Sequence, residues 1–154
     1  MRLAAAALSV FALSAVAWAA VGDPIVGTPA ADRLVGTPRA ERIVGLDGRD
    51  RINGRGGDDV LIGGPDGDVL IGGGGDDRID ARDREPARCT LRSVQTRLDY
   101  PPCVDVVVAG LGDDVILMRD GRFDTIWFCG AGVDRVIADP PDEVAGDCEL
   151  VRRT

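Results

Sequence analysis

The sequence predicts an all-β fold, a parallel β-solenoid in which tight turns and short strands alternate with two nine-residue repeats in each coil. From Gly27 to Asp80 the chain divides without a gap into six nine-residue segments. Each segment opens with glycine, carries Asp or Glu at its sixth place and has Leu or Ile at its eighth. Self-similarity at a short fixed period indicates a solenoid, because each unit buries its apolar residue only by stacking on its neighbours.

Each repeat divides into a turn and a strand. The first six places are rich in glycine and end on an acid, which is typical of turns, since glycine enters left-handed backbone conformations without steric cost. In the three-residue strand that follows, the eighth residue points inward while the seventh and ninth point outward. The predicted inner stack consists of the eighth-place residues Leu34, Ile43, Ile52, Leu61, Leu70 and Ile79.

The acidic residues form two predicted columns, because residues eighteen apart lie above one another in a solenoid with two repeats per coil. The columns are Asp32, Asp50 and Asp68 on one edge and Glu41, Asp59 and Asp77 on the other. Like charges at the strand spacing of about 4.8 Å repel by roughly 1 kcal/mol per pair in water, and by several times that where they are buried. The columns therefore require cations or protons. The alternative, a metal-free solenoid with solvated acids, does not explain why aspartate and glycine recur in fixed phase.

Composition favours calcium as that cation. The chain has no histidine, which removes the commonest general base and the commonest transition-metal ligand. Its net charge of −8 disfavours nucleic acid and anionic membranes as partners. Carboxylate and carbonyl oxygens are the ligands that calcium prefers. We therefore expect several calcium ions, with folding coupled to their binding.

The repeats resemble the haemolysin-type, or repeats-in-toxin (RTX), calcium-binding family, whose nonapeptide is G-G-x-G-x-D-x-U-x. Residues 72–79 match every defined place, and the segments that open at Gly45, Gly54 and Gly63 each lack one glycine. The resemblance implies a small secreted bacterial protein with a parallel β-roll, in which turn carbonyls and sixth-place aspartates hold calcium. The candidate ligand positions are Asp50, Asp59, Asp68, Asp77, Asp114 and, more weakly, Asp134, with Gly45, Gly48, Gly54, Gly57, Gly63, Gly64, Gly72, Gly73 and Gly75.

The first two repeats depart from this pattern. Thr28 and Thr37 replace the second glycine, and Glu41 replaces the aspartate of the second repeat. We expect these two repeats to form strands without metal, as a terminal cap.

The amino-terminal residues 1–19 read as an export signal. A positive residue, Arg2, precedes an apolar run, and Ala17-Trp18-Ala19 has the small-x-small pattern of a cleavage site. The alternative, a membrane anchor, needs about 20 apolar residues, and this stretch is shorter. The expected protein is therefore secreted into the extracellular space, with residues 20–26 as a lead-in that contains a partial repeat.

Beyond Asp80 the period is interrupted. Residues 81–99 read as an arginine-rich insertion, and residues 100–154 as degenerate repeats that end in a C-terminal cap held by a disulfide bond. Residues 109–117 return in phase with only the first glycine missing, whereas later copies slip by a residue. The slips predict a solenoid that continues but bends or loosens.

Four cysteines in an exported chain favour two disulfide bonds, for which the sequence alone allows three pairings. We expect Cys89–Cys103 to close the insertion and Cys129–Cys148 to hold the C-terminal segment. A zinc site and a thiol catalyst are the alternatives, but the chain has neither histidine nor a C-x-x-C pair.

The predicted function is calcium binding by a structural module without enzymatic activity. One alternative is an adhesion or matrix protein that presents Val60, Ile62, Val69 and Ile71 as an outer apolar surface, unless the C-terminal segment covers them. Another is a polysaccharide-active β-solenoid enzyme, which the mostly Arg, Val and Ile outer strand places disfavour. The sequence does not identify an extracellular protein or polysaccharide partner.

Overall fold

The structure is a computed structural model that describes residues 23–83 and 104–154. Within these residues the chain forms strands and no helix, so the predicted all-β class is confirmed. No helix in this part of the chain is long and apolar enough to cross a membrane. The strands are β1 (Ile25–Val26), β2 (Arg33–Val35), β3 (Arg42–Val44), β4 (Arg51–Asn53), β5 (Val60–Ile62), β6 (Val69–Gly74), β7 (Arg78–Asp80), β8 (Val106–Leu111), β9 (Val115–Leu117), β10 (Thr125–Ala131), β11 (Arg135–Ala138) and β12 (Leu150–Arg153).

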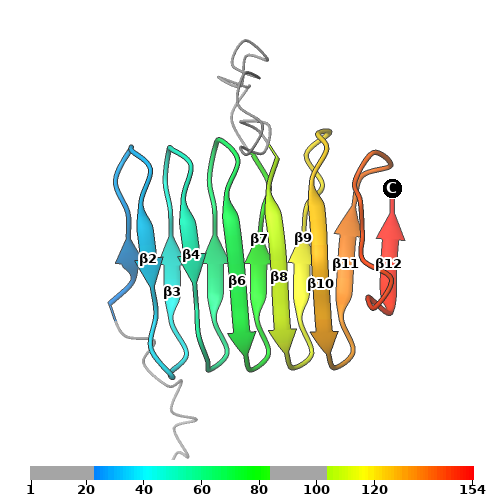
Figure 1. The fold of residues 1–154 in the computed structure, drawn as a ribbon, viewed down its shortest axis with the longest axis horizontal. Coiled ribbons are helices and arrows are strands. Elements are labelled where there is room, and N and C mark those ends of the chain that lie inside the picture. Colours follow the sequence, from blue (N-terminus) through cyan, green and yellow to red (C-terminus); the bar gives the residue numbers. More distant parts are fainter. Residues whose placement is uncertain (1–22, 84–103) are drawn as a thin grey trace, which may run out of the picture.

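The strands form two parallel sheets that wind as one β-roll (Figure 1). The seven-stranded sheet has the order β1-β3-β5-β7-β9-β11-β12, and the five-stranded sheet has the order β10-β8-β6-β4-β2. From β1 to β11, successive strands alternate between the two sheets. The predicted parallel β-solenoid with two repeats per coil is therefore confirmed.

The core is a column of single side chains between the sheets. Strand register places each eighth-place residue over the one in the next coil, as Leu34 over Ile52 and Ile52 over Leu70. Ile43, Ile52, Leu61, Leu70 and Ile79 are all 0% exposed. The later coils continue this column through the buried residues Val107, Ile116, Ile126 and Val136.

The roll continues past the insertion in the same register. The β7–β9 and β6–β8 pairs are in register, as in the pairing of Val69 with Val106. The stacked residues Asp68 and Asp105 are 37 residues apart in the sequence, whereas stacked residues of a regular coil are 18 apart. Most of the insertion lies outside the described residues, as does the predicted signal peptide.

A β-bulge accounts for part of the later slip in phase. In the β10–β8 pair, Ile126 and Phe128 are partners of consecutive residues of β8, so Trp127 is an extra residue in the strand. Because of this bulge, Trp127 and Phe128 are both exposed, by 55% and 51%. The chain thus absorbs the slip locally, and the solenoid continues as predicted.

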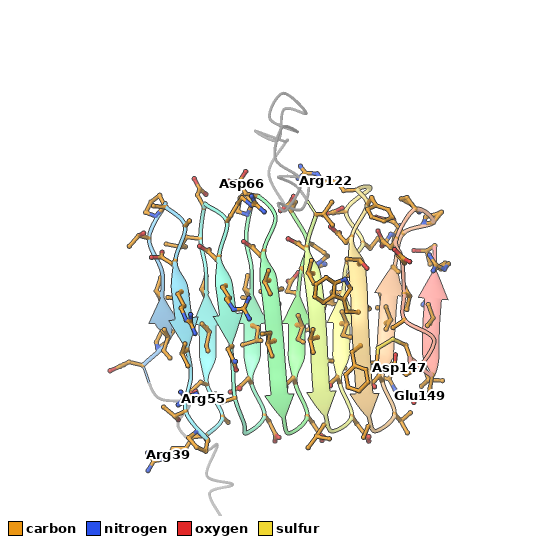
Figure 2. The ribbon with its side chains drawn as sticks, viewed as in Figure 1. Arg39, Arg55, Asp66, Arg122, Asp147 and Glu149 are labelled. Atoms are coloured by element: carbon orange, nitrogen blue, oxygen red, sulfur yellow. A yellow bond between two sulfur atoms is a disulfide. The ribbon has the colours of Figure 1, made fainter. Side chains whose placement is uncertain are left out.

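The turns lie along two edges of the roll. Figure 2 places Asp66 and Arg122 on one edge, called the upper edge, and Arg39 and Arg55 on the opposite, lower edge. The upper turns are 27–32, 45–50, 63–68 and 118–124, and the lower turns are 36–41, 54–59, 72–77, 109–114 and 129–134.

The expected single apolar surface is wrong. Val60 and Ile62 belong to β5 in the seven-stranded sheet, whereas Val69 and Ile71 belong to β6 in the five-stranded sheet. Consecutive repeats enter different sheets, so the two pairs lie on opposite outer faces of the roll. The C-terminal strand β12 pairs with β11 and extends the seven-stranded sheet.

A disulfide bond joins Cys129 to Cys148, the pairing that the sequence favours, with the Cα atoms 5.2 Å apart. Asp147 lies next to these two sulfur atoms, but they are bonded to each other and so are not thiolate ligands for a metal. The other expected pair, Cys89–Cys103, lies outside the described residues.

Because each short strand buries few side chains, we predict that the free energy of unfolding depends strongly on each buried residue of the core. Replacing Leu61, which is fully buried, by alanine should lower the free energy of unfolding by about 2–5 kcal/mol, because neighbouring coils cannot collapse into the space. Urea denaturation of the calcium-loaded protein measures this loss. The matched change Val35→Ala, at a side chain 38% exposed, should lower it far less, and equal losses would contradict a core of this kind.

Candidate metal sites

The sixth-place carboxylates join successive coils at the turns. The backbone N–H of Asp50 donates to Oδ1 of Asp68 at 2.8 Å, and that of Asp59 donates to Oδ1 of Asp77 at 2.9 Å. The same bond spans the insertion, from the N–H of Asp68 to Oδ1 of Asp105. The upper column is Asp32, Asp50, Asp68, Asp105, Asp124 and Asp142, and the lower column is Glu41, Asp59, Asp77, Asp114, Asp134 and Glu149.

The second oxygen of these carboxylates has no partner. In the described residues, eight aspartates have a buried side-chain oxygen that makes no hydrogen bond. Seven of these are Oδ2 atoms of the two columns, in Asp50, Asp59, Asp68, Asp77, Asp114, Asp124 and Asp134. A buried charged oxygen without a partner is strongly unfavourable, so these positions require a cation or a proton.

The first glycine of each repeat gives these oxygens their space. A Cβ atom on Gly45 would come closer than 3.0 Å to both Oδ2 of Asp50 and the carbonyl oxygen of Gly63. A Cβ atom on Gly72 would likewise come closer than 3.0 Å to Oδ2 of Asp77 and to the carbonyl oxygen of Ala109. Gly54 lies likewise against Asp59 and the carbonyl oxygen of Gly72, whereas Gly63 lies against Asp68 alone. At Gly45, Gly54 and Gly72 a carboxylate oxygen and a carbonyl oxygen of the next coil thus converge, and such an all-oxygen set suits calcium.

The second and fourth turn places adopt left-handed backbone conformations, as at Gly73 (φ 122°) and Gly75 (φ 113°). Six turns share this geometry: 45–50, 54–59, 63–68, 72–77, 109–114 and 129–134. Three of them hold it with one residue other than glycine, namely Leu46, Arg55 or Asp66. Such residues are strained by about 1–3 kcal/mol each. A missing glycine therefore does not change the turn, and the expected glycines Gly48, Gly57 and Gly64 also have positive φ.

The first two turns satisfy their carboxylates with protein groups. Both the backbone N–H and the hydroxyl of Thr28 donate to Oδ2 of Asp32, at 2.6 and 2.9 Å. The N–H of Thr37 donates to Glu41 at 2.7 Å, and its hydroxyl also bonds that carboxylate. Side-chain and backbone hydrogen bonds from Thr37 lower the pKa of Glu41. The carboxylates of these two turns thus accept hydrogen bonds where those of the later turns have a bare oxygen.

Burial has the opposite effect on the other column carboxylates. Desolvation raises the pKa of Asp50, Asp59 and Asp114 to about 6, in each case with a contribution from neighbouring carboxylates. It raises the pKa of Asp77 to about 7 and that of Asp68 to about 9. The charged form is therefore disfavoured in the folded chain unless positive charge is brought to it.

Arginines supply positive charge on the upper edge beyond Asp68. Arg122 forms an ion pair with the buried carboxylate of Asp83, and Arg82 pairs with Asp80 at 2.7 Å. Burial raises the pKa of Asp83 to about 6, although Arg122 opposes the shift. Nothing in the repeat pattern pointed to Asp83, because it stands within the insertion.

Two further groups of acidic residues at the turns were not predicted as site candidates. Asp105 and Asp124 are buried members of the upper column, and their place directly before a strand was the signal that could have identified them. Fifth-place residues form a further ladder on the lower edge, in which the N–H of Asp76 donates to Asp58 and that of Asp113 to Asp76, both at 2.9 Å.

The fold and its two rows of buried carboxylates define a calcium-binding β-roll. The family of the RTX calcium-binding nonapeptide repeat (four copies) matches residues 26–61, 35–70 and 58–83. Residues 26–83 therefore belong to the RTX calcium-binding repeat family, as the sequence pattern predicted. Searches among curated proteins and among solved structures found no match.

The raised pKa values predict that protons stabilise the calcium-free roll. A carboxyl group whose pKa is higher in the folded than in the unfolded state contributes stability below about pH 4 that is lost as the pH passes through its folded pKa. For Asp50, Asp77 and Asp68 those values are about 6, 7 and 9. In a calcium chelator, the thermal midpoint should therefore be higher at about pH 5 than at about pH 8. A midpoint that rises with pH in the chelator would contradict this assignment.

Proposed function

We propose that this chain is a secreted calcium-binding protein whose β-roll folds as calcium enters between its stacked turns. The supporting observation is the row of buried, unpartnered Oδ2 atoms, which at Gly45, Gly54 and Gly72 lie beside a carbonyl oxygen of the next coil. Without a cation these aspartates are either charged and mutually repulsive or protonated. Calcium, when bound, supplies the positive charge that the columns lack, and so it couples binding to folding.

The turn geometry suggests how many ions the chain takes. On the lower edge, turns 54–59, 72–77, 109–114 and 129–134 stack in succession with the left-handed pattern, which leaves three intervals between turns. On the upper edge only turns 45–50 and 63–68 have it, which leaves one. We therefore place four calcium ions. The carboxylates that would hold them are Asp59, Asp77, Asp114 and Asp134 on the lower edge and Asp50 and Asp68 on the upper edge.

Secretion gives this coupling a consequence for the cell. Extracellular calcium modules bind with dissociation constants of about 10⁻⁴–10⁻³ M, so the low calcium inside a cell would leave the chain loosely folded. Residues 1–19 have the pattern of an export signal. Folding would then be completed outside, where calcium is plentiful.

We propose a binding role and not a catalytic one. The carboxylates with raised pKa values, which are the usual candidates for acid–base catalysis, lie under the stacked turns. Asp50, Asp59 and Asp77 are at most 2% exposed, and Asp68 and Asp114 are 0% exposed. A substrate does not reach such groups without unstacking the turns.

A substitution that removes the charge of Asp77 distinguishes a calcium ligand from an aspartate with a purely structural role. Asp77→Asn should make the calcium-free protein more stable at about pH 8, because it removes a desolvated charge, yet weaken calcium binding at least tenfold. Thermal unfolding in chelator and calorimetric calcium titration measure the two effects.

The matched control is Asp32→Asn, since Thr28 already satisfies Asp32. It should leave the number of bound ions unchanged. A purely structural role for Asp77 would instead make Asp77→Asn unstable with and without calcium.

Calorimetric titration of the folded, oxidised protein should give four ions, and circular dichroism should show β-structure rising cooperatively with calcium. Two ions would limit binding to the repeats between Gly45 and Asp77, and three would exclude Asp134. An unchanged spectrum after chelation would show that folding does not depend on calcium.

A further inference from the structure

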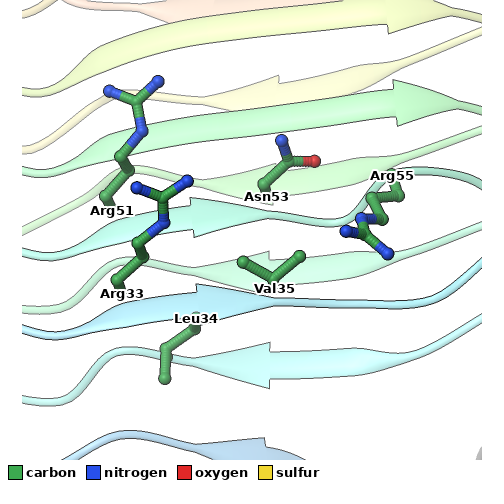
Figure 3. Close-up of a pocket in the computed structure, with 6 residues that line it drawn as sticks. All are labelled: Arg33, Leu34, Val35, Arg51, Asn53 and Arg55. Atoms are coloured by element: carbon green, nitrogen blue, oxygen red, sulfur yellow. The ribbon is translucent and has the colours of Figure 1, made fainter.

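The outer face of the five-stranded sheet carries a cluster of arginines near its N-terminal end. The β2–β4 register makes Arg33 and Arg51 direct neighbours, and both side chains are exposed. Figure 3 shows the two side chains running side by side, with the guanidinium group of Arg55 on the far side of Asn53. Together these residues line a groove of about 130 Å³, of which Leu34 and Val35 complete the lining.

Among the residues that the structure describes, the cluster has no negative partner. No carboxylate lines the groove. Within residues 23–83 and 104–154, Arg33, Arg51 and Arg55 form no ion pair and no side-chain hydrogen bond.

The other sheet shows that such a cluster is not an automatic result of the repeat. In the seven-stranded sheet the same seventh place alternates, so that Val60 lies between Arg42 and Arg78 and Val115 lies between Arg78 and Arg135. Among the described strand pairs, arginine lies opposite arginine only at Arg33 and Arg51. Like charges directly opposite destabilise a sheet, so this pair calls for an anion.

Arg55 reaches the groove from a strained backbone. It occupies the second place of its turn with φ 78°, where the stacked residue of the next coil is Gly73 (φ 122°). Glycine would adopt this conformation without strain. Strained residues are concentrated at functional sites, where the structure holds them for what the side chain does.

We propose that Arg33, Arg51, Asn53 and Arg55 form a binding site for an oxyanion of the sulfate or carboxylate class. The planar fork of a guanidinium group donates two parallel hydrogen bonds to such a group, and the amide of Asn53 adds a further donor. The surrounding net charge of −8 disfavours anions elsewhere, so binding is confined to this face. None of these side chains belongs to the calcium columns, although Arg55 stands in the turn that ends at Asp59.

The test is calorimetric titration of the calcium-loaded, oxidised protein with sodium sulfate at low ionic strength. Saturable binding is expected, and Arg51→Ala should weaken it at least tenfold. Arg78→Ala is the matched control, because Arg78 has the same repeat place and is also exposed, but lies on the other sheet between two valines. Equal losses in the two variants, or no saturable binding by the unaltered protein, would overturn the proposal.

Arg55→Gly separates loss of the site from loss of the fold. It should raise the thermal midpoint by relieving the backbone and still weaken sulfate binding several-fold. Leu46→Gly relieves the same strain at the upper edge (φ 80°), so it should raise the midpoint and leave sulfate binding unchanged. Full sulfate binding by the Arg55→Gly variant would overturn the assignment of Arg55.

The same oxyanion chemistry could be free or carried on a polymer, and dextran sulfate distinguishes the two. Tighter binding of dextran sulfate than of sulfate, lost with Arg51→Ala, would identify a polymer-borne group. Equal affinity per sulfate group, also lost with Arg51→Ala, would identify a small anion. Binding of dextran sulfate that Arg51→Ala does not affect would overturn the site.

Discussion

The structure depends on an aspartate carboxylate whose two oxygens have different roles. One oxygen accepts a backbone N–H from the neighbouring coil, as in the bond from Asp50 to Asp68, and so aligns the coils. The other oxygen is buried without a partner. A short strand such as β4 buries one side chain, Ile52, between the sheets, so hydrophobic burial gives each coil little to offset the desolvation of that oxygen. The alignment of the coils and the need for positive charge therefore have the same cause.

The two edges of the roll meet this need differently. On the lower edge, four similar turns follow one another from residue 54 to residue 134 without interruption. On the upper edge, the insertion separates Asp68 from Asp105, and ion pairs of Arg82 with Asp80 and of Arg122 with Asp83 lie where it begins. The first coil uses threonine hydroxyl and N–H groups. A guanidinium group and a hydroxyl are two observed solutions to the same problem, buried negative charge at a stacked turn, and calcium is the third that we propose.

The sequence predicted the coil, the core column and the two acidic columns, because an uninterrupted period of nine determines which residues stack. It could not predict the ion pair of Arg122 with Asp83, since that contact joins the insertion to a later turn. The sequence also could not predict the bulge at Trp127, because an extra residue in the period can be placed in a turn as well as in a strand. Val60 and Val69 were wrongly placed on one surface because the alternation between sheets was applied to the core and not to the outer faces.

Strands β7 and β8 are separated by the insertion, yet the coils on both sides of it remain in register. The roll thus keeps one register on both sides of a segment that interrupts its nine-residue period. Since the entropy of closing a loop grows only slowly with its length, segments of very different size would fit between Asp83 and Val104. Insertions of different sequence and length would therefore leave the β-roll unchanged. Related chains would then differ most in sequence at a point where the register of their coils is the same.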